Sequence, residues 1–225
     1  MSLGWKPVDA PAKAALTGAS VRLEPLDPAR HGRSLFAAAH PDAAGADRLF
    51  RHLAYGPFAA FEEFEAWLER CAASADPLFF AIIDLETHEA AGMTSYMRIV
   101  PEHGVIEIGN IWFAPGLQRT RKATEAIYLM CRHVFDDLGY RRLEWKCDAL
   151  NQPSRRAAAR FGFTYEGVFR QHLVVKDRNR DTAWFSMLDG EWPRVRAAFE
   201  AWLSPDNFDG AGTQRRSLAT IRDSS

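Results

Sequence analysis

The strongest constraint on the fold is a run of three strand patterns that leads directly into a helix pattern. The three stretches are "LFFAIID", "AAGMTSYMRIV" and "GVIEIGNIWFAP" (residues 78–84, 90–100 and 104–115). Strands that follow one another through short polar turns usually pair antiparallel. From Ala123 the apolar residues recur at helical spacing up to Leu138, and Gly139 is suited to the position after a helix end. A meander followed by an amphipathic helix predicts a sheet covered by helices.

Further patterns on both sides of the meander complete the predicted fold. Strands are expected at residues 21–26, 141–148, 163–175 and 181–188, and helices at residues 28–39, 61–71, 153–161 and 191–203. This order predicts an α/β (α+β) fold, with a mixed, mostly antiparallel central sheet of about seven strands and helices on both faces.

One domain accounts for most of the chain. Residues 21–204 carry the periodic patterns and are numerous enough to bury one sizeable core. Residues 1–20 are small and weakly patterned, and residues 205–225 have little apolar content. We expect both ends to be loose segments.

Composition argues against several classes of function. The formal net charge is −1, which favours neither nucleic acid nor an anionic membrane as a partner. No apolar run approaches the ~20 residues that span a bilayer. The three cysteines fit no metal-binding spacing, so we expect no metal site and buried thiols in a reducing cytoplasm. The glycine-rich P-loop motif is absent.

Residues 118–122, "QRTRK", lie at the mouth of the predicted helix that follows the meander. Three of these five residues are cationic. Free backbone N–H groups and the positive end of the helix dipole occupy the same place. Cations there are unfavourable unless an anion joins them, so the segment predicts a site for phosphate oxygens.

This segment resembles a motif of the GNAT superfamily of acyl-CoA-dependent N-acyltransferases. The motif is Gln/Arg-x-x-Gly-x-Gly/Ala, followed by a helix that often opens Thr-Glu-Ala. Gln118, Ala123 and residues 124–126 match it, whereas Arg121 replaces the first glycine. An arginine cannot let the backbone approach a pyrophosphate as glycine does, but its guanidinium can bind a phosphate bidentately.

A second segment, "NQPSRRAAARFGFTYEGVFR", resembles the Asn-x-x-Ser helix of the same superfamily and the strand after it. The likeness is to its ribosomal-protein N-terminal acetyltransferase branch, and it covers residues 21–192. The matching residues are Asn151, Ser154, Gly162, Phe163, Glu166, Gly167 and Arg170.

The resemblance implies where acetyl-CoA would bind. The fourth and fifth strands would splay apart and hold the cofactor between them, with main-chain contacts from Ile111, Trp112 and Phe113. The pyrophosphate would lie on residues 118–124, namely Gln118, Arg119, Thr120, Arg121, Lys122, Ala123 and Thr124. Asn151 would contact the pantetheine, and Arg156 would reach the 3′-phosphate, with Arg155 and Arg160 as the other candidates.

The chemistry needs a neutral amine, a stabilised oxyanion and a proton for the leaving thiolate. Glu107 is the preferred base, acting through water, with Asn110 as the alternative. Strict strand alternation puts Glu107, Gly109 and Ile111 on one face, and Ile108, Asn110 and Trp112 on the other. A main-chain N–H near Ile111 or Trp112 would stabilise the oxyanion. Ser154 is the remaining candidate for the proton donor, with solvent as the alternative, because residues 157–159 lack the tyrosine that many family members use.

The implied function is transfer of an acetyl group from acetyl-CoA to a primary amine, either a peptide N-terminus or a small molecule. The alternative is a degenerate GNAT fold that binds acyl-CoA or a partner without turnover. Aromatic residues within residues 47–64 and the charged hairpin tip at residues 174–181 are expected to select the amine. The oligomeric state is left open, a homodimer included.

Overall fold

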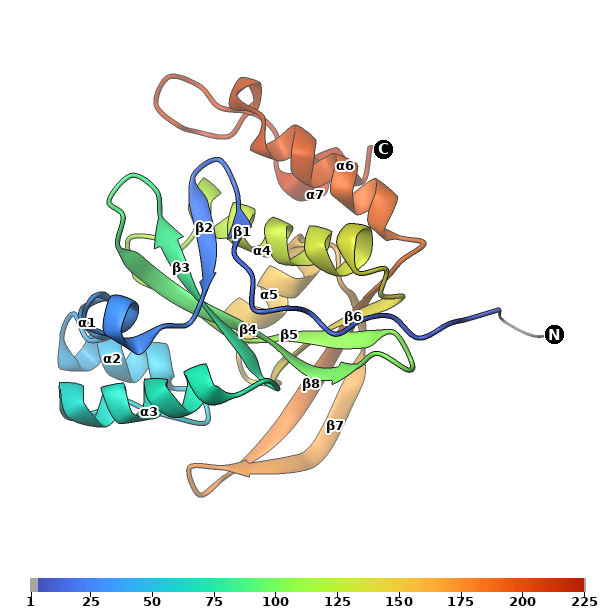
Figure 1. Ribbon diagram of the computed structural model, residues 1–225. Coiled ribbons are helices and arrows are strands. Elements are labelled where there is room, and N and C mark those ends of the chain that lie inside the picture. The colour runs from blue at the N-terminus through green and yellow to red at the C-terminus, as the bar shows by residue number, and fades with distance from the viewer. Residues whose placement is uncertain (1–3, 225) are drawn as a thin grey trace.

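A computed structural model of the chain describes residues 4–224 and contains an eight-stranded sheet (Figure 1). The order across the sheet is β1-β2-β3-β4-β5-β6-β8-β7. Paired strands are antiparallel, except that β5 and β6 are parallel. The strands are β1 (Leu16–Thr17), β2 (Val21–Pro25), β3 (Leu78–Asp84), β4 (Ala90–Val100), β5 (Val105–Phe113), β6 (Arg142–Asp148), β7 (Thr164–Val175) and β8 (Arg178–Leu188). The predicted mixed, mostly antiparallel sheet is confirmed.

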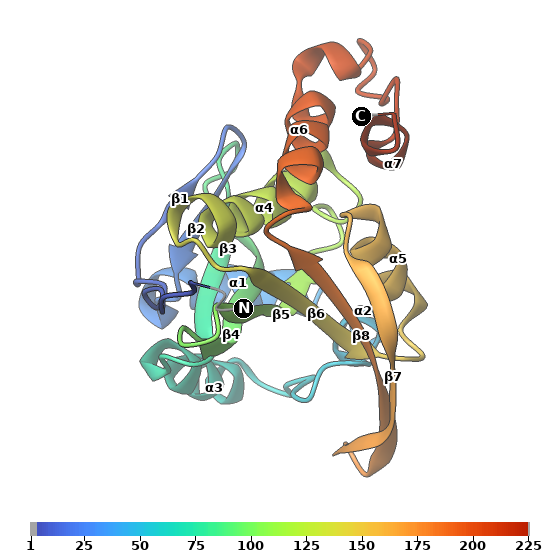
Figure 2. The same ribbon diagram turned by 90° about the vertical axis from the view of Figure 1, so that its right-hand side faces the viewer.

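Helices cover both faces of the sheet, as predicted (Figures 1 and 2). On one face lie α1 (Pro28–Ala39), α2 (Ala43–Phe50) and α3 (Phe61–Ala73). On the other lie α4 (Arg121–Arg132), α5 (Gln152–Arg160), α6 (Trp192–Leu203) and α7 (Leu218–Arg222). A π-helical turn (His133–Asp137) continues α4, and a 3-10 turn (Pro205–Asn207) follows α6. Within residues 4–224, no helix is both long and apolar enough to cross a membrane.

Two hydrophobic clusters, one on each face of the sheet, hold these layers together. Phe64 and Leu68 of α3 pack in the first, here called the α1–α3 cluster. Ile127 and Met130 of α4 pack in the second, here called the α4 cluster. All four side chains are fully buried, because they recur at helical spacing and form one apolar stripe on each helix. The meander therefore lies between helices on both sides.

The strands β5 and β6 separate partway along their length. They pair from Val105 and Arg142 to Ile108 and Trp145, and both strands then continue without pairing to each other, β5 as far as Phe113. With the short β1 left aside, these are the fourth and fifth strands, so the predicted splay is confirmed. Their divergence leaves one edge of β5 open.

A β-bulge in β5 overturns the strict alternation expected for that strand. Gly109 pairs with Ser95 and Trp112 with Met93, so two residues of β5 face one residue of β4. Asn110 supplies the kink with a φ of 52°. Ile108 consequently packs in the α4 cluster while Trp112 packs in the α1–α3 cluster, on the opposite face. The prediction that these two side chains share a face was wrong.

The N-terminal segment differs from the loose end that its composition suggested. The Glu125 carboxylate accepts hydrogen bonds from the backbone N–H groups of Ala19 and Ser20, at 2.7 and 2.8 Å. Leu16 is buried, and Trp5 donates a hydrogen bond to the carbonyl of Glu102. These contacts fix the turn between β1 and β2 on α4. Residues 1–3 lie outside the described part of the chain.

The C-terminal segment, also expected to be loose, packs on the core. Leu218 and Ile221 of α7 are 2% and 7% exposed and belong to the α4 cluster. The Arg222 guanidinium donates hydrogen bonds to the carbonyls of Ala159 and Arg160 at the end of α5. Two apolar residues three positions apart are enough to bury one face of a short helix, although they scarcely change the average composition. Residue 225 lies outside the described part.

Candidate active site

The diverging strands β5 and β6 border a cleft of about 1950 Å³. Residues in and around α2 and residues of the β7–β8 hairpin line one end of it, and the residues after α6 line the other. Most of the residues predicted for catalysis or cofactor binding line this cleft: Glu107, Asn110, Ile111, Trp112, Phe113, Gln118, Arg119, Thr120, Arg121, Ala123, Thr124, Asn151, Ser154 and Arg156. The fold thus brings together residues separated by up to 49 positions, counted from Glu107 to Arg156.

The mouth of α4 opens into the cleft. Thr120 is the N-cap, and its hydroxyl accepts from the Ala123 N–H at 3.2 Å while donating to the Leu117 carbonyl at 2.7 Å. Arg121 begins the helix, so the arginine in place of the motif glycine has an ordinary helical backbone. The N–H groups of Arg121 and Lys122 lie in the first turn, where helix geometry offers them no acceptor. They are suited to an anion.

Four arginines, Arg119, Arg121, Arg156 and Arg160, line the cleft near this helix mouth. Within residues 4–224, none of the four has a carboxylate within ion-pair distance. Arg121 donates to the carbonyl of Leu203, and burial lowers the pKa of Arg160, which lies 4.8 Å from the Trp202 ring. The unneutralised positive charge at this end favours an anionic ligand.

Lys122 does not join the predicted cradle. Its ammonium lies 2.7 Å from Asp84, the last residue of β3, and 2.8 Å from Glu86 in the turn that follows. Lys122 does not line the cleft. Successive helical residues point about 100° apart, so Lys122 lies on a different flank of α4 from Arg121. The expectation that all three cations face the same ligand was wrong.

Glu107 is buried at the other end of the cleft, with 4% of its surface exposed. Its carboxylate lies 2.9 Å from the Lys146 ammonium and 3.1 Å from the Arg98 guanidinium. Burial raises the pKa of Glu107, and the charges of Lys146 and Arg98 oppose that rise. The result is a carboxylate removed from water and suited to take up a proton.

Asn110 has a mainly structural environment. Its side-chain amide donates to the Ser95 hydroxyl at 2.9 Å, and that hydroxyl donates to the Gly109 carbonyl at 3.2 Å. Asparagine tolerates the left-handed backbone conformation that the bulge requires. The bulge interrupts the β4 ladder at Asn110 and Ile111, beside the cleft, where main-chain groups of β5 are accessible to a ligand.

Two polar residues mark the entry of α5, on the opposite wall of the cleft. Asn151 is the N-cap, and its side-chain carbonyl accepts from the Ser154 N–H at 3.1 Å. The Ser154 hydroxyl accepts from the Trp145 indole N–H at 3.0 Å, and its own proton faces the Cys147 sulfur, to which it is hydrogen-bonded. Both residues line the cleft.

The aromatic residues predicted to form the acceptor wall lie elsewhere. Phe50, Tyr55 and Phe58 pack in the α1–α3 cluster, and none of them lines the cleft. Their apolar surface is used for the core. Charged and polar neighbours, Arg48, Arg51 and His52, line the cleft instead, and His52 bonds to Asp148 at 2.8 Å.

Sequence reasoning missed Lys146 of β6 and His172 of β7, and it named Arg180 only as part of the charged hairpin tip at residues 174–181. Lys146 of β6 and His172 and Arg180 of the hairpin all line the cleft. Alternation in "RRLEWKCD" carried a usable signal, because Leu143, Trp145 and Cys147 are buried in the α4 cluster while Glu144 and Lys146 point to the other face. A charged pair on that face indicated a polar lining.

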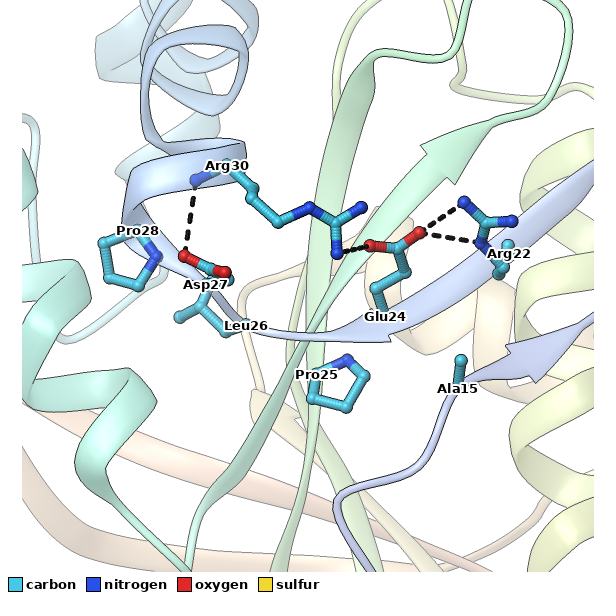
Figure 3. A pocket seen from close by; sticks show the side chains of 8 residues that line it. All are labelled: Ala15, Arg22, Glu24, Pro25, Leu26, Asp27, Pro28 and Arg30. Atoms are coloured by element: carbon cyan, nitrogen blue, oxygen red, sulfur yellow. Dashed lines mark hydrogen bonds and ion pairs between the residues drawn. The ribbon is translucent and has the colours of Figure 1, made fainter.

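A second hollow, of about 630 Å³, lies beside β2 and the start of α1 (Figure 3). Its acidic residues are Glu24 and Asp27, and its cations are Arg22 and Arg30. The Glu24 carboxylate lies 2.7 Å from Arg22, 2.8 Å from Arg30 and 3.1 Å from the neighbouring His31. The charges within this hollow therefore neutralise one another. It shares no residue with the cleft.

Known proteins resemble this chain over most of its length. The family model described as Acetyltransferase (GNAT) domain matches residues 21–164. The crystal structure of a GCN5-related N-acetyltransferase from Brucella melitensis is 52% identical in sequence, with a TM-score of 0.95. That match covers 98% of this chain and 99% of the other.

Two curated relatives match over shorter stretches. "Uncharacterized N-acetyltransferase p20" of Bacillus licheniformis is 32% identical over 115 residues, which are 50% of this chain and 63% of that protein. "Putative ribosomal N-acetyltransferase YdaF" of Bacillus subtilis (strain 168) is 29% identical over 101 residues, which are 45% of this chain and 55% of that protein. The chain thus matches less than two thirds of the length of either relative, and the second name agrees with the branch indicated by the sequence.

Proposed function

The chain belongs to the GNAT acetyltransferase family, and we propose that it transfers the acetyl group of acetyl-CoA to a primary amine by direct attack. The observation that supports this proposal is the distribution of charge along the cleft. An unneutralised arginine cluster lies at one end and the buried carboxylate of Glu107 at the other. A ligand that is anionic at one end and reacts with an amine at the other fits this distribution of charge.

In the proposed complex, acetyl-CoA lies along the edge of β5 that β6 leaves open. Ile111, Trp112 and Phe113 would supply strand-like main-chain contacts to the pantetheine. The pyrophosphate would lie on the first turn of α4, against Arg121, with Arg119 and the residues around it completing the cradle. The 3′-phosphate would bind Arg156 or Arg160 across the cleft.

The same placement assigns roles in the chemistry. Glu107 would accept the amine proton through water, so that a neutral amine attacks the thioester carbon. A main-chain N–H at the Asn110 bulge would stabilise the oxyanion of the tetrahedral intermediate. When the carbon–sulfur bond breaks, the thiolate leaves and takes a proton, with the hydroxyl of Ser154 as its nearby donor and solvent as the final source.

The acceptor in this proposal is a peptide N-terminus or a small-molecule amine. The polar lining near Glu107 and Lys146 suits an amine and its solvated neighbours better than an apolar substrate. A cytoplasmic location fits the free, buried cysteines Cys71, Cys131 and Cys147, since a reducing compartment keeps thiols unpaired.

The test is thiol release from acetyl-CoA in the presence of a panel of N-terminal peptides, amino acids and polyamines. The proposal predicts release that depends on both protein and amine, and a gain of one acetyl group on the amine by mass spectrometry. N-terminally acetylated versions of the same peptides are the matched control and should release no thiol. Tight binding of acetyl-CoA with no acetylated product from any amine would favour the non-enzymatic alternative.

A further inference from the structure

The end of the cleft around Glu107, here called the acceptor end, is built from one residue of each strand from β4 to β8. These residues are Arg98, Glu107, Lys146, His172 and Arg180, and all of them line the cleft. The hairpin that carries the last two extends beyond the rest of the sheet (Figure 2). Lys176, at its tip, donates a hydrogen bond to the carbonyl of Phe50 at the end of α2. The acceptor end is therefore enclosed by segments from both halves of the chain.

The carboxylates of this region are already engaged. Glu107 is paired with Lys146 and Arg98, and Glu144 lies 2.6 Å from Lys146. Asp148 uses one oxygen for His52, at 2.8 Å, and the other for the Leu150 N–H, at 2.9 Å. Both cations of Glu107 lie on its Oε2 atom, so Oε1 stays outside these ion pairs, whereas both oxygens of Glu144 are taken, by Arg142 and Lys146.

Arg180 is the cation without such a partner. No carboxylate of residues 4–224 lies within ion-pair distance of its guanidinium, and its Nε atom is buried without a hydrogen-bond acceptor in that part of the chain. A buried donor left unsatisfied is costly, which makes Arg180 a candidate for binding a ligand group.

The pKa of His172 reflects its burial and the positive charges around it at the acceptor end. Its ring nitrogen Nδ1 lies 3.0 Å from the Thr182 hydroxyl. Burial lowers the pKa of His172, and the charges of Arg98, Arg180 and Lys146 lower it further. Two of these three cations, Arg98 and Lys146, are paired with carboxylates, whereas Arg180 has no such partner within residues 4–224, so its charge is the uncompensated one beside His172.

Two β-bulges, one in β4 at Arg98 and one in β7 at Gln171, position the side chains of Arg98 and His172. Arg98 has a φ of 49°, and the N–H groups of Arg98 and Ile99 donate to Asp76 at 2.8 and 3.1 Å. Gln171, next to His172, has a φ of 50°, and its N–H donates to Asp181 at 2.7 Å. Non-glycine residues in this conformation are unfavourable and are concentrated at functional sites. Each bulge is braced by an aspartate, and each delivers a polar side chain into the acceptor end.

We propose that the acceptor is an acidic amine, in which a carboxylate close to the primary amine binds Arg180, with Arg98 and His172 beside it. This inference rests on the proposed acetyl transfer and names the substrate class of the same site. A guanidinium binds a planar carboxylate bidentately, with two parallel N–H···O bonds, and the positive surroundings reject a second cation. The amine would then lie toward Glu107, and its carboxylate toward the β7–β8 hairpin.

The test compares matched acceptors at saturating acetyl-CoA. One set is peptides that differ only in Glu or Gln at the second position, and the other is ω-amino acids with their primary amides. The inference predicts kcat/KM roughly tenfold or more higher for the acid of each pair, the range expected of one charge-assisted hydrogen bond. If only the peptides show the preference, the carboxylate belongs to a peptide acceptor. If only the ω-amino acids show it, the carboxylate belongs to a small-molecule acceptor.

A substitution of Arg180 tests whether this residue causes the preference for acids. Arg180→Gln should lower kcat/KM for the acid about tenfold or more and bring the ratio of acid to amide toward one. Arg194→Gln is the matched control, because Arg194 is exposed on α6 and does not line the cleft. The acid preference should persist in that control.

Two results would overturn the inference. Equal kcat/KM for acids and amides in the wild-type protein would exclude an acidic acceptor, and an undiminished preference in Arg180→Gln would exclude Arg180 as its binding residue. Failure of every amine, with acetyl-CoA still bound, would instead overturn the proposed transfer and this inference with it. The last result differs from the first two because no product forms at all.

Discussion

The Lys146 ammonium lies 2.9 Å from the Glu107 carboxylate, and both side chains are about 95% buried. This ion pair links β5 to β6 next to the last residues at which the two strands pair, just before the cleft opens. Burial alone would favour a protonated, neutral Glu107, whereas Lys146 favours its ionised form. The pair therefore keeps a buried carboxylate able to accept a proton.

Replacing Glu107 by Gln removes this acceptor and should lower kcat/KM by about a hundredfold or more, the usual size of a general-base contribution. Because a base must be ionised, wild-type kcat/KM should fall as the pH decreases through the raised pKa of Glu107. The variant should lack that acid limb. Steady-state rates across pH, with an amine found in the panel, measure both effects.

Calorimetry with acetyl-CoA is the control for the Glu107→Gln variant, because Glu107 lies at the acceptor end and its loss should leave the Kd for acetyl-CoA unchanged. An identical pH profile in wild type and variant would contradict the role of Glu107. The proton would then pass to solvent.

Arg121→Gln and Arg160→Gln should each weaken CoA binding by ~1–3 kcal/mol where the arginine makes a charge-assisted bond to phosphate. The effect should shrink as salt is added, since salt screens charges at an open cleft. Titration calorimetry at two ionic strengths checks this. Lys122→Gln is the matched control, because Lys122 is paired with Asp84 and Glu86 outside the cleft. A double arginine variant that binds CoA as the parent does would refute the cradle.

Glu166→Gln should make the fold less sensitive to acid. The hydrogen bonds from Arg142 lower the pKa of Glu166 from its ordinary 4.5 to about 2. A depressed folded-state pKa stabilises the fold above the ordinary value, and the stabilisation is lost as the pH falls toward about 2. The Tm of wild type should exceed that of the variant at neutral pH, and the difference should vanish in strong acid. A Tm difference that is constant over this range would be the contrary outcome.

Leu218→Ala should destabilise the protein by ~2–5 kcal/mol, the usual cost of truncating a buried leucine. Leu218 is 2% exposed within the α4 cluster, although it belongs to a segment with a loose-end composition. Leu150→Ala, at a side chain that is 77% exposed, is the control and should change stability little. Urea unfolding measures both variants, and equal midpoints would show that α7 contributes nothing to the core.

Periodic patterns predicted the parts of the fold that depend on local sequence. The stripe from Ala126 to Leu138 located α4 because one face of that helix is buried along its whole length. Helix α2 went unrecognised because Ala43–Phe50 is short and contains Gly45, so its helical signal is weak. The bulge at Asn110 also escaped notice, since strand register is set by the partner strand and not by the strand alone.

The candidate site could be predicted only as far as the motifs extend. Residues 118–124 follow the end of β5, so the motif at the mouth of α4 identified them from the sequence, and all but Lys122 line the cleft. Arg180 and Lys146 could not be assigned in this way, because their roles depend on which carboxylates the fold brings near them. The direction of Arg121 depends on Leu203 and Phe208, more than eighty positions away.

The central claim, that the cleft between β5 and β6 is an acetyl-CoA site, is tested most directly by a crystal structure with acetyl-CoA bound. We expect pyrophosphate density on the first turn of α4, within hydrogen-bond distance of the Arg121 N–H. We also expect the thioester beside the Asn110 bulge, with its carbonyl toward the main chain of β5. Acetyl-CoA bound anywhere outside this cleft, or a cleft left empty at saturating ligand, would contradict the account.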